Sequence, residues 1–242
     1  MAYPERIVPD ETPPGPVAIH EKRYRFALPY CAGKRVLDAA CGVGYGTALL
    51  ADAAREVVGV DVSQEAIAYA RSRYARPNVE FRVEDLLAPD LADRDFDVVC
   101  SFETLEHLAD RETYLEHLAR VLRDDGVYIV STPRTDETTE SPDNPHHFVE
   151  YSSGDFERLL RPHFARVELY GQRRIQTRRH RWLQRLDVLG LRRRLGFMRG
   201  VGRLATGTDP TQDVSLDGIA IERRDVDTAD VLLAVCRRPS RA

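Results

Sequence analysis

Short apolar runs alternate with amphipathic stretches along most of the chain from Lys34 onward. The apolar runs are "RVLDAA", "EVVGVDV", "VEFRVED", "DVVCSF", "VYIVSTP", "ARVELYG" and "ADVLLAVC". Helical patterns lie between them, near residues 46–54, after the N-cap candidate Ser63, near residues 111–123 and after Ser152, and the turn "RDDG" precedes the fifth run. Because strands rich in β-branched residues alternate with helices, we expect an α/β fold with a doubly wound, seven-stranded, mostly parallel sheet.

The two ends of this pattern differ from its middle. Residues 1–16 are rich in proline and predict an irregular N-terminal arm, and "VAIHEKRYRFALPYC" then predicts a helix. Residues 173–207 interrupt the alternation before the last strand with arginines interleaved with leucines and Trp182. We interpret them as one or two amphipathic helices inserted into a single domain that covers residues 17–242.

Composition fits one soluble domain. The 242 residues are 43% hydrophobic and 31% charged, and no apolar run approaches the length of a membrane span. Since the first residues also lack the apolar core of a signal peptide, we expect a cytoplasmic protein. Four widely spaced cysteines form no zinc-binding pattern and are expected to be reduced and mostly buried.

Charge is distributed unevenly. Residues 172–207 hold eleven arginines and one acid, Asp187, so this segment carries +10 and the remaining chain carries −14. The acidic remainder argues against nucleic-acid binding by the molecule as a whole, although a local basic surface stays open.

The stretch "VLDAACGVGYG", residues 36–46, carries the most specific chemistry. Asp38 ends the first strand, and Gly42, Gly44 and Gly46 follow in the turn into a helix. Glycines in such a turn let the backbone approach a ligand closely. The dinucleotide fingerprint GxGxxG would need glycine at Thr47, so this turn does not predict a nicotinamide site. An acid before the glycines instead suits a ligand with a cationic amino group.

Two further acids end the next strands. Asp61 follows "VVGV" and is placed to accept hydrogen bonds from ribose hydroxyls, and Asp85 in "VEDLL" is placed to accept from an adenine amino group. Because carboxyl ends of parallel strands share one edge of a sheet, the three acids predict one adenosine-containing ligand.

In this order and spacing, the chain resembles class I S-adenosylmethionine-dependent methyltransferases, and more closely their small-molecule group that includes the ubiquinone-biosynthesis enzymes. The resemblance runs from about Ile19 to Gly171, with a last strand near 229–237. It implies S-adenosylmethionine as cofactor and the following cofactor-binding residues: Tyr24, Asp38, Ala40, Gly42, Gly44, Asp61, Val62, Asp85, Leu86 and Ser101. His20 and Arg23 are secondary candidates, since "HEKRYRFA" resembles the helix that closes over the methionine carboxylate. Many relatives have glycine in place of Ala40, and we expect the extra methyl to be tolerated with a negative φ.

The end of the fourth strand, "CSFETLEHL", bears on the methyl acceptor. It contains neither the Asn/Asp-Pro-Pro-aromatic element of base N-methylating enzymes nor the Pro-Cys pair of cytosine methylation, which argues against a nucleic-acid acceptor. "ETLEHL" is common in small-molecule methyltransferases. Glu103, Glu106 and His107 are candidates for the pocket, and helix capping explains the carboxylates equally well.

A long polar loop, "STPRTDETTESPDNPHHFVEY", follows the fifth strand. Its end resembles the Asn-Pro-x-His element of methyltransferases encoded near glycan or natural-product assembly enzymes, with Asn144, Pro145 and His147 in the matching places. An alcohol must lose its proton during methylation, and a histidine is a natural acceptor. We expect His147 to be the catalytic base, oriented by Asp143 or Glu150, with His146 as a second candidate. The alternative is that His147 only fixes the loop.

The same loop offers four acids, Asp136, Glu137, Glu140 and Asp143, as oxygen ligands for Mg²⁺. Their spacing matches no recognised cage, so we favour a solvated loop and expect no metal site there.

The basic insertion has several possible roles. It can cover the acceptor, bind a polyanion, pack in a homodimer or lie on an anionic membrane through residues 173–203. Taken together, the sequence predicts an O-methyltransferase for a small polar acceptor, with a sugar or glycan favoured. N-methylation, methylation of a quinol or lipid hydroxyl, and a non-catalytic cofactor-binding partner subunit remain alternatives.

Overall fold

An eight-stranded sheet with the order β3-β2-β1-β4-β5-β8-β6-β7 organises the protein. The computed structural model describes residues 6–88, 95–175 and 214–240. The strands are β1 Arg35–Ala39, β2 Glu56–Asp61, β3 Val79–Val83, β4 Phe96–Phe102, β5 Leu122–Pro133, β6 Phe164–Arg174, β7 Ile219–Glu222 and β8 Val231–Pro239. The helices are α1 Pro14–Cys31, α2 Tyr45–Leu50, α3 Gln64–Tyr74, α4 Arg111–Val121 and α5 Ser153–Leu160, with the 3₁₀ turns η1 Leu105–His107, η2 Leu216–Gly218 and η3 Val226–Thr228.

Most of the sheet is parallel, as the sequence predicted. Strands β3, β2, β1, β4 and β5 pair in parallel, whereas β8 pairs antiparallel with both β5 and β6. The predicted number of seven strands is wrong by one, because β7 adds an antiparallel edge strand against Gly171–Arg174 of β6. The first two residues of the expected insertion, Arg173 and Arg174, therefore belong to β6. Residues 176–213 lie outside the described residues, and with them the rest of the proposed basic helices.

Local signals explain where the helices begin. The hydroxyl of Ser63 accepts from the backbone N–H of Ala66 at the start of α3, and the hydroxyl of Ser152 accepts from Asp155 at the start of α5. Helix α1 begins at Pro14, three residues before the expected helix, because proline is well suited to the first turn. Residues 14–16 of the expected irregular arm are thus helical.

The predicted turn "RDDG" is a bulge within β5. Leu122 pairs with Phe96 of β4, and the next pair joins Val127 to Val98, so the four intervening residues protrude from the ladder.

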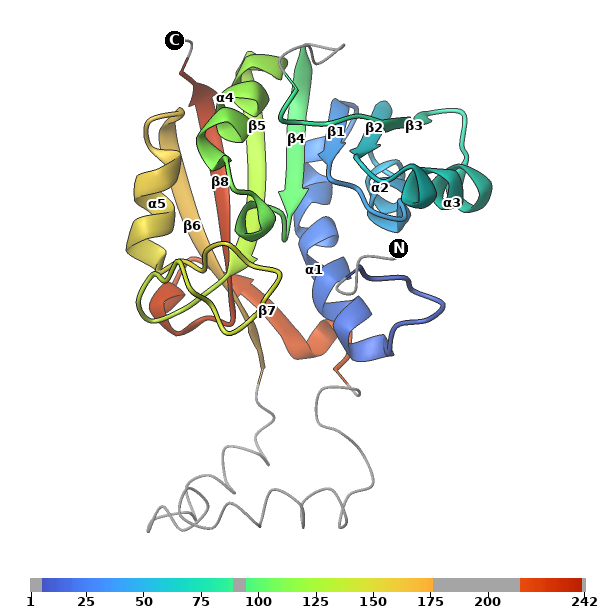
Figure 1. Cartoon of the computed structure of the whole chain (residues 1–242). Helices are drawn as coiled ribbons and strands as arrows, with labels where there is room; N and C mark the ends of the chain where they lie inside the picture. Colours follow the sequence, from blue (N-terminus) through green and yellow to red (C-terminus); the bar gives the residue numbers. More distant parts are fainter. Residues whose placement is uncertain (1–5, 89–94, 176–213, 241–242) are drawn as a thin grey trace, which may run out of the picture.

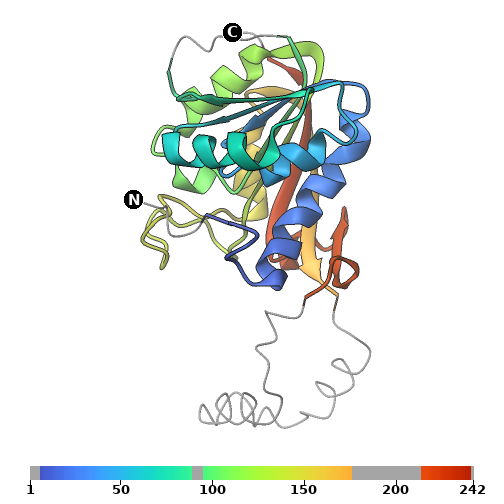
Figure 2. The same ribbon diagram turned by 90° about the vertical axis from the view of Figure 1, so that its right-hand side faces the viewer.

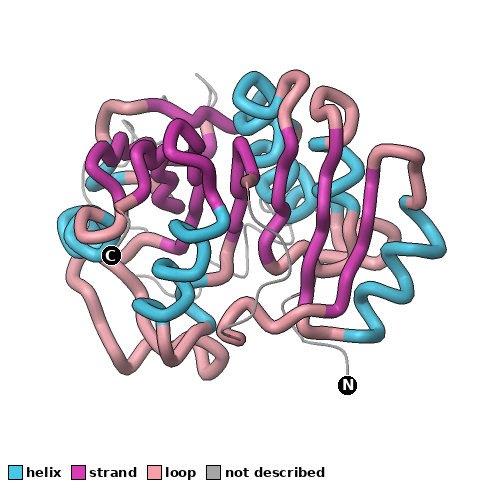
Figure 3. Tube along the Cα trace, turned by 90° about the horizontal axis from the view of Figure 1, so that it is seen from above, coloured by secondary structure: helices cyan, strands magenta, loops and turns pink. Residues whose placement is uncertain are grey.

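Helices cover both faces of the sheet (Figures 1 and 2). α1 and α2 pack on one face around Leu50, Val57 and Ile129, and α3 lies beside them. α4 and α5 pack on the other face, where Leu118, Phe156 and Leu160 are fully buried. Seen from above, the strands run between these two layers (Figure 3). All four cysteines are buried and form no disulfide, as expected. No helix in the described ranges is both long and apolar enough to cross a membrane.

The carboxyl ends of the parallel strands bring together the residues of the candidate site. The arrows of β4 and β5 point downward in Figure 1 and end above the loop 134–152, and α1 runs down beside them. Since β1 pairs with both β2 and β4, the ends of these strands are neighbours at this edge of the sheet.

Candidate cofactor and acceptor site

Asp38, in β1, is almost completely buried, with 1% of its surface exposed. The hydroxyl of Thr47 donates to its Oδ2 over 2.6 Å, and the hydroxyl of Tyr24 donates to its Oδ1 over 3.3 Å. Burial raises the pKa of the Asp38 carboxyl to about 7, with a smaller contribution from the charge of Asp61, although the two hydrogen bonds oppose the rise. A buried carboxyl that ionises near neutrality is suited to pair with a cationic group.

The turn after β1 depends on residues with positive φ. Gly42 and Gly44 have φ of +55° and +83°. A Cβ on Gly44 would lie 2.6 Å from atoms of Ala70 and Phe81, so the turn packs directly on α3 and β3. Because Gly46 has no side chain, the ring of Tyr24 packs directly against it; an added Cβ would overlap that ring. Ala40 does not meet the condition under which its methyl is expected to be tolerated, because its φ is +61° rather than negative. It occupies the left-handed region, which costs a residue with a Cβ about 1 kcal/mol.

Asp61, at the end of β2, holds the turn from the other side. Its Oδ2 accepts from the N–H of Gly42 and its Oδ1 from the N–H of Ser63, both over 2.9 Å. The next side chain, Val62, is apolar yet 72% exposed. An anionic acceptor beside an exposed apolar side chain fits a ribose followed by a flat base.

The remaining expected cofactor residues are placed differently. Asp85 is exposed and its Oδ1 accepts from the N–H of Leu87, so it also closes the turn after β3. The side chain of Leu86 belongs to the buried core, and the hydroxyl of Ser101 bonds with that of Tyr114 over 2.8 Å. The side chains of Leu86 and Ser101 therefore pack inside the protein and offer no polar group to a ligand.

Helix α1 contributes the two secondary candidates, His20 and Arg23. Nδ1 of His20 bonds with the hydroxyl of Tyr45, and burial lowers the pKa of this histidine. Arg23 is 3% exposed; its Nη1 donates to Gln172 over 3.2 Å and its Nη2 lies 3.7 Å from Glu103. Its Nε is buried without a hydrogen-bond partner among the described residues. That orphaned donor fits a carboxylate in the site.

The end of the N-terminal arm also reaches the site, which the sequence did not predict. Nη2 of Arg6 lies 3.7 Å from Oδ1 of Asp61. Asp10 anchors the segment to α3 by accepting from Arg73 over 3.1 Å and from Tyr69 over 3.4 Å. The arm therefore lies over the end of β2, beside the expected cofactor-binding residue Asp61.

The acceptor side is assembled from η1 and the loop after β5. The N–H of Phe148 donates to the carbonyl of Glu106 over 2.7 Å, and Nδ1 of His107 donates to the carbonyl of His146 over 3.0 Å. These two bonds fix the loop against the turn that ends β4.

His147 has a defined tautomer in this loop. Its Nδ1 lies 2.7 Å from Oε1 of Glu150, and its Nε2 lies 3.0 Å from the amide nitrogen of Asn144. Since an amide nitrogen can only donate, Nε2 carries the lone pair and Nδ1 carries the proton. Glu150 thus orients the ring, and the other proposed partner, Asp143, is exposed. The imidazole therefore links Asn144 and Glu150 and fixes the loop, while its role as the catalytic base stays a prediction.

Glu106 is fully buried beside this histidine. Its Oε2 accepts from the hydroxyl of Thr132 over 3.0 Å, and its Oε1 has no partner among the described residues. Burial raises the pKa of Glu106 well above its usual value, and the charge of Glu103 raises it further. Glu103 has a φ of +52° and accepts from the hydroxyl of Ser131. The carboxylates of Glu103 and Glu106 accept hydrogen bonds from hydroxyls of β5, at Ser131 and Thr132. Helix capping does not explain these contacts.

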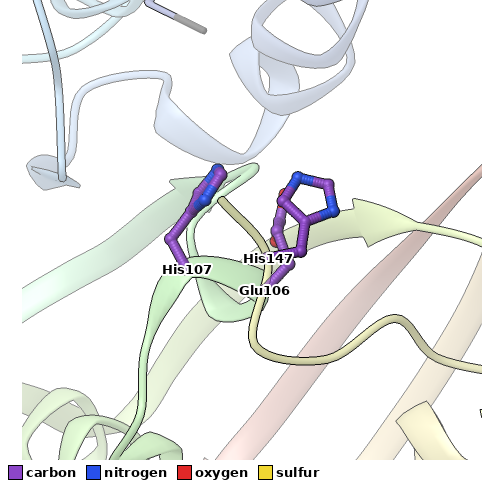
Figure 4. Close-up of side chains that lie close together, drawn as sticks. All are labelled: Glu106, His107 and His147. Atoms are coloured by element: carbon purple, nitrogen blue, oxygen red, sulfur yellow. The ribbon is translucent and has the colours of Figure 1, made fainter. Parts of the chain in front are cut away.

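Glu106, His107 and His147 form a cluster (Figure 4). One potential ligand atom from each lies within 4.8 Å of the others, and the two imidazole rings meet edge to face with centroids 4.8 Å apart. The four acids considered for Mg²⁺ are exposed instead, and Asp136 pairs with Arg134. Within residues 6–88, 95–175 and 214–240, this is the group of three His, Cys, Asp or Glu side chains that lie close enough together to hold one metal ion.

Comparison with known proteins finds relatives for the part of the chain that holds this site. The family described as "Methyltransferase domain" matches residues 37–130. A protein of Mycolicibacterium smegmatis, named a probable S-adenosylmethionine-dependent methyltransferase, is 40% identical over 144 residues, which are 58% of this chain and 55% of the relative. A ubiquinone biosynthesis O-methyltransferase of Mesorhizobium japonicum is 36% identical over 110 residues, or 45% of this chain and 44% of the relative.

Among solved structures, the N-methyltransferase NodS of Bradyrhizobium japonicum has a TM-score of 0.58 at 16% identity, covering 95% of this chain and 90% of that one. This likeness shows the fold alone. The chain spans about half the length of the curated relatives that it matches.

Proposed function

We propose that this chain, which carries a class I S-adenosylmethionine-dependent methyltransferase domain, transfers a methyl group from S-adenosylmethionine to a hydroxyl of a small polar acceptor, in particular a sugar or glycan. The cofactor supplies a methyl group on a sulfonium. The remaining chemistry falls to residues of this chain.

Residues at the ends of β1 to β3 bind and orient the cofactor in this proposal. Asp38 pairs with the amino group, Asp61 accepts from the ribose hydroxyls, and Val62 covers one face of the adenine. The orphaned Nε of Arg23 donates to the carboxylate of the methionine part. Asp85 accepts from the adenine amino group, and the main chain at Ala40, Gly42 and Gly44 allows the close approach.

The acceptor hydroxyl binds beside the cluster at the ends of β4 and β5. Methyl transfer is an in-line displacement, so alignment of the oxygen and exclusion of water supply most of the acceleration. The hydroxyl proton passes to Nε2 of His147, where the acceptor takes the place of the Asn144 amide. Glu150, 2.7 Å from Nδ1, stabilises the imidazolium that forms.

The His147–Glu150 pair is the single observation that carries a hydroxyl acceptor. A neutral amine attacks without prior loss of a proton, whereas an alcohol needs a base, and this ring has its lone pair and its proton fixed on opposite nitrogens. The Mesorhizobium relative is itself named an O-methyltransferase. A polar acceptor is favoured because the loop offers amide, imidazole and carboxylate groups rather than an apolar slot.

A methyl-transfer screen tests the proposal. The full chain is incubated with tritiated S-adenosylmethionine and panels of sugars, glycans, phenols, lipids and amines. The proposal predicts label on a sugar hydroxyl, and label restricted to amines or to quinols and lipids would contradict it. Cofactor binding without label on any panel member would favour a non-catalytic partner subunit.

A further inference from the structure

We propose that Glu106, His107 and His147 bind a divalent transition-metal cation of the Zn²⁺ class at the acceptor subsite. The inference that the cluster binds a cation rests only on the geometry of the cluster. Its consequence for methyl transfer rests on the proposed function.

The type and number of ligand atoms favour a cation of the Zn²⁺ class. The cluster offers two imidazole nitrogens and one carboxylate oxygen, which lie within 4.8 Å of one another. Two histidines with one carboxylate are a ligand set for Zn²⁺ and related cations, whereas Mg²⁺ and Ca²⁺ prefer oxygen ligands alone. With metal–ligand distances of about 2.1 Å, the three atoms must draw together by roughly 1 Å.

The orphaned oxygen of Glu106 points to a ligand independently. Glu106 is 0% exposed, yet only Oε2 has a partner, the hydroxyl of Thr132. Buried carboxylate oxygens without partners are rare in folded proteins, since each loses its hydration without compensation. A cation at the cluster supplies the missing interaction.

Each histidine already has one ring nitrogen that donates to an oxygen atom. Nδ1 of His107 donates to the carbonyl of His146, and Nδ1 of His147 donates to Glu150. In metal sites the second ring nitrogen commonly donates to a carbonyl or carboxylate, which fixes the tautomer and aims the other nitrogen at the metal. For His147 that nitrogen is Nε2, where the Asn144 amide donates over 3.0 Å and a cation would replace it.

A bound cation changes the role of His147. When Nε2 ligates a metal, its lone pair is no longer able to accept the proton of the acceptor hydroxyl. Zn²⁺ and methyl transfer therefore exclude each other at this site, and Zn²⁺ is a reversible inhibitor of the proposed reaction.

Cobalt titration tests the binding directly, because Co²⁺ substitutes for Zn²⁺ and absorbs visible light in low-symmetry nitrogen and oxygen sites. The full-length chain is titrated with Co²⁺ and then with competing Zn²⁺. We expect one saturable site per chain, with affinity at least about 100-fold lower in Glu106→Gln and His107→Ala, since even second-shell changes cost 10- to 100-fold. Glu150→Gln removes the carboxylate charge behind His147 and should weaken binding about tenfold.

Two controls separate this site from others. His163→Ala removes a histidine that pairs with Glu112 over 2.8 Å elsewhere, and Asp136→Asn removes an exposed loop acid; both should bind Co²⁺ like the unaltered chain. Absence of a saturable site, or equal affinity in Glu106→Gln and His107→Ala, would overturn the inference. Failure of the metal titration leaves the methyl-transfer screen unaffected, so the two proposals fail separately. Once an acceptor is known, activation rather than inhibition by Zn²⁺ would refute the exclusion.

Discussion

The two halves of the candidate site are built in different ways. The cofactor half consists of residues that follow directly on β1 and β2, and its acids bond to the turns beside them, as Asp61 does with Gly42 and Ser63. The acceptor half consists of η1 and a loop some forty residues later, joined by the bonds from Phe148 to Glu106 and from His107 to His146. One half is specified locally, and the other exists only after the chain has folded.

This difference explains what the sequence could predict. Asp38, Asp61 and the glycine turn were recognisable because their spacing within two consecutive strand–turn–helix units determines their geometry. The buried position of Glu106 was not, because it depends on Thr132 and on the loop that covers it. His147 was found through its resemblance to a loop element, but its pairing with Glu150 instead of Asp143 is set by the folded loop.

Parts of the fold could not be predicted from the sequence for similar reasons. β7 is a strand only because β6 extends to Arg174 and offers an open edge. The "RDDG" bulge looks like a turn in the sequence, since polar residues with a glycine are typical of both. The positive φ of Ala40 was also unexpected, because nothing in an alanine signals a left-handed conformation.

The largest effect should come from the acceptor half. His147→Ala is expected to lower O-methylation by about 10²- to 10⁴-fold, since it removes the proton acceptor, and to leave cofactor affinity unchanged within about twofold. Initial rates and cofactor titrations measure the two quantities. His163→Ala, which breaks the other histidine–glutamate pair at 2.8 Å, is the matched control and should retain full activity. A parallel loss of cofactor affinity in His147→Ala would mean that the halves are not separable.

Asp38→Asn is the corresponding change in the cofactor half. It keeps the shape but removes the charge that pairs with the amino group, so S-adenosylmethionine affinity should fall by roughly 100-fold, about 3 kcal/mol. The pKa of Asp38 in the folded protein, about 7, is raised above its unfolded value, so its contribution to stability is lost as pH rises through 7. Thermal unfolding at pH 8 should therefore show an unchanged or higher Tm in Asp38→Asn. A lower Tm would mean that the carboxylate is structural.

The same pKa predicts how cofactor affinity depends on pH. Binding of the cationic amino group needs ionised Asp38, so affinity should rise about five- to tenfold between pH 6 and pH 7.5. Calorimetric titrations at the two values measure the change, and Asp38→Asn should abolish it. An equally steep rise in Asp38→Asn would assign the dependence to another group.

The smallest expected effect concerns stability alone. Ala40→Gly should relieve the left-handed conformation and stabilise the fold by about 1 kcal/mol, which corresponds to roughly 2–4 °C in Tm. Gly33→Ala is the reverse control, because Gly33 has a φ of +70° with no atom within 4 Å of an added Cβ. It should lose about as much as Ala40→Gly gains. Equal Tm values for both variants and the unaltered chain would show that backbone strain is not significant at either position.

The most direct test of the two-part site is a calorimetric titration of S-adenosylmethionine into the unaltered chain, Asp61→Asn and His147→Ala in parallel. Asp61 accepts from Gly42 and Ser63 and is the acid proposed to bind the ribose, whereas His147 lies on the acceptor side. We expect one cofactor per chain, at least about tenfold weaker binding in Asp61→Asn, and unchanged binding in His147→Ala. No binding to the unaltered chain, or equal affinity in Asp61→Asn, would contradict the assignment of the cofactor half.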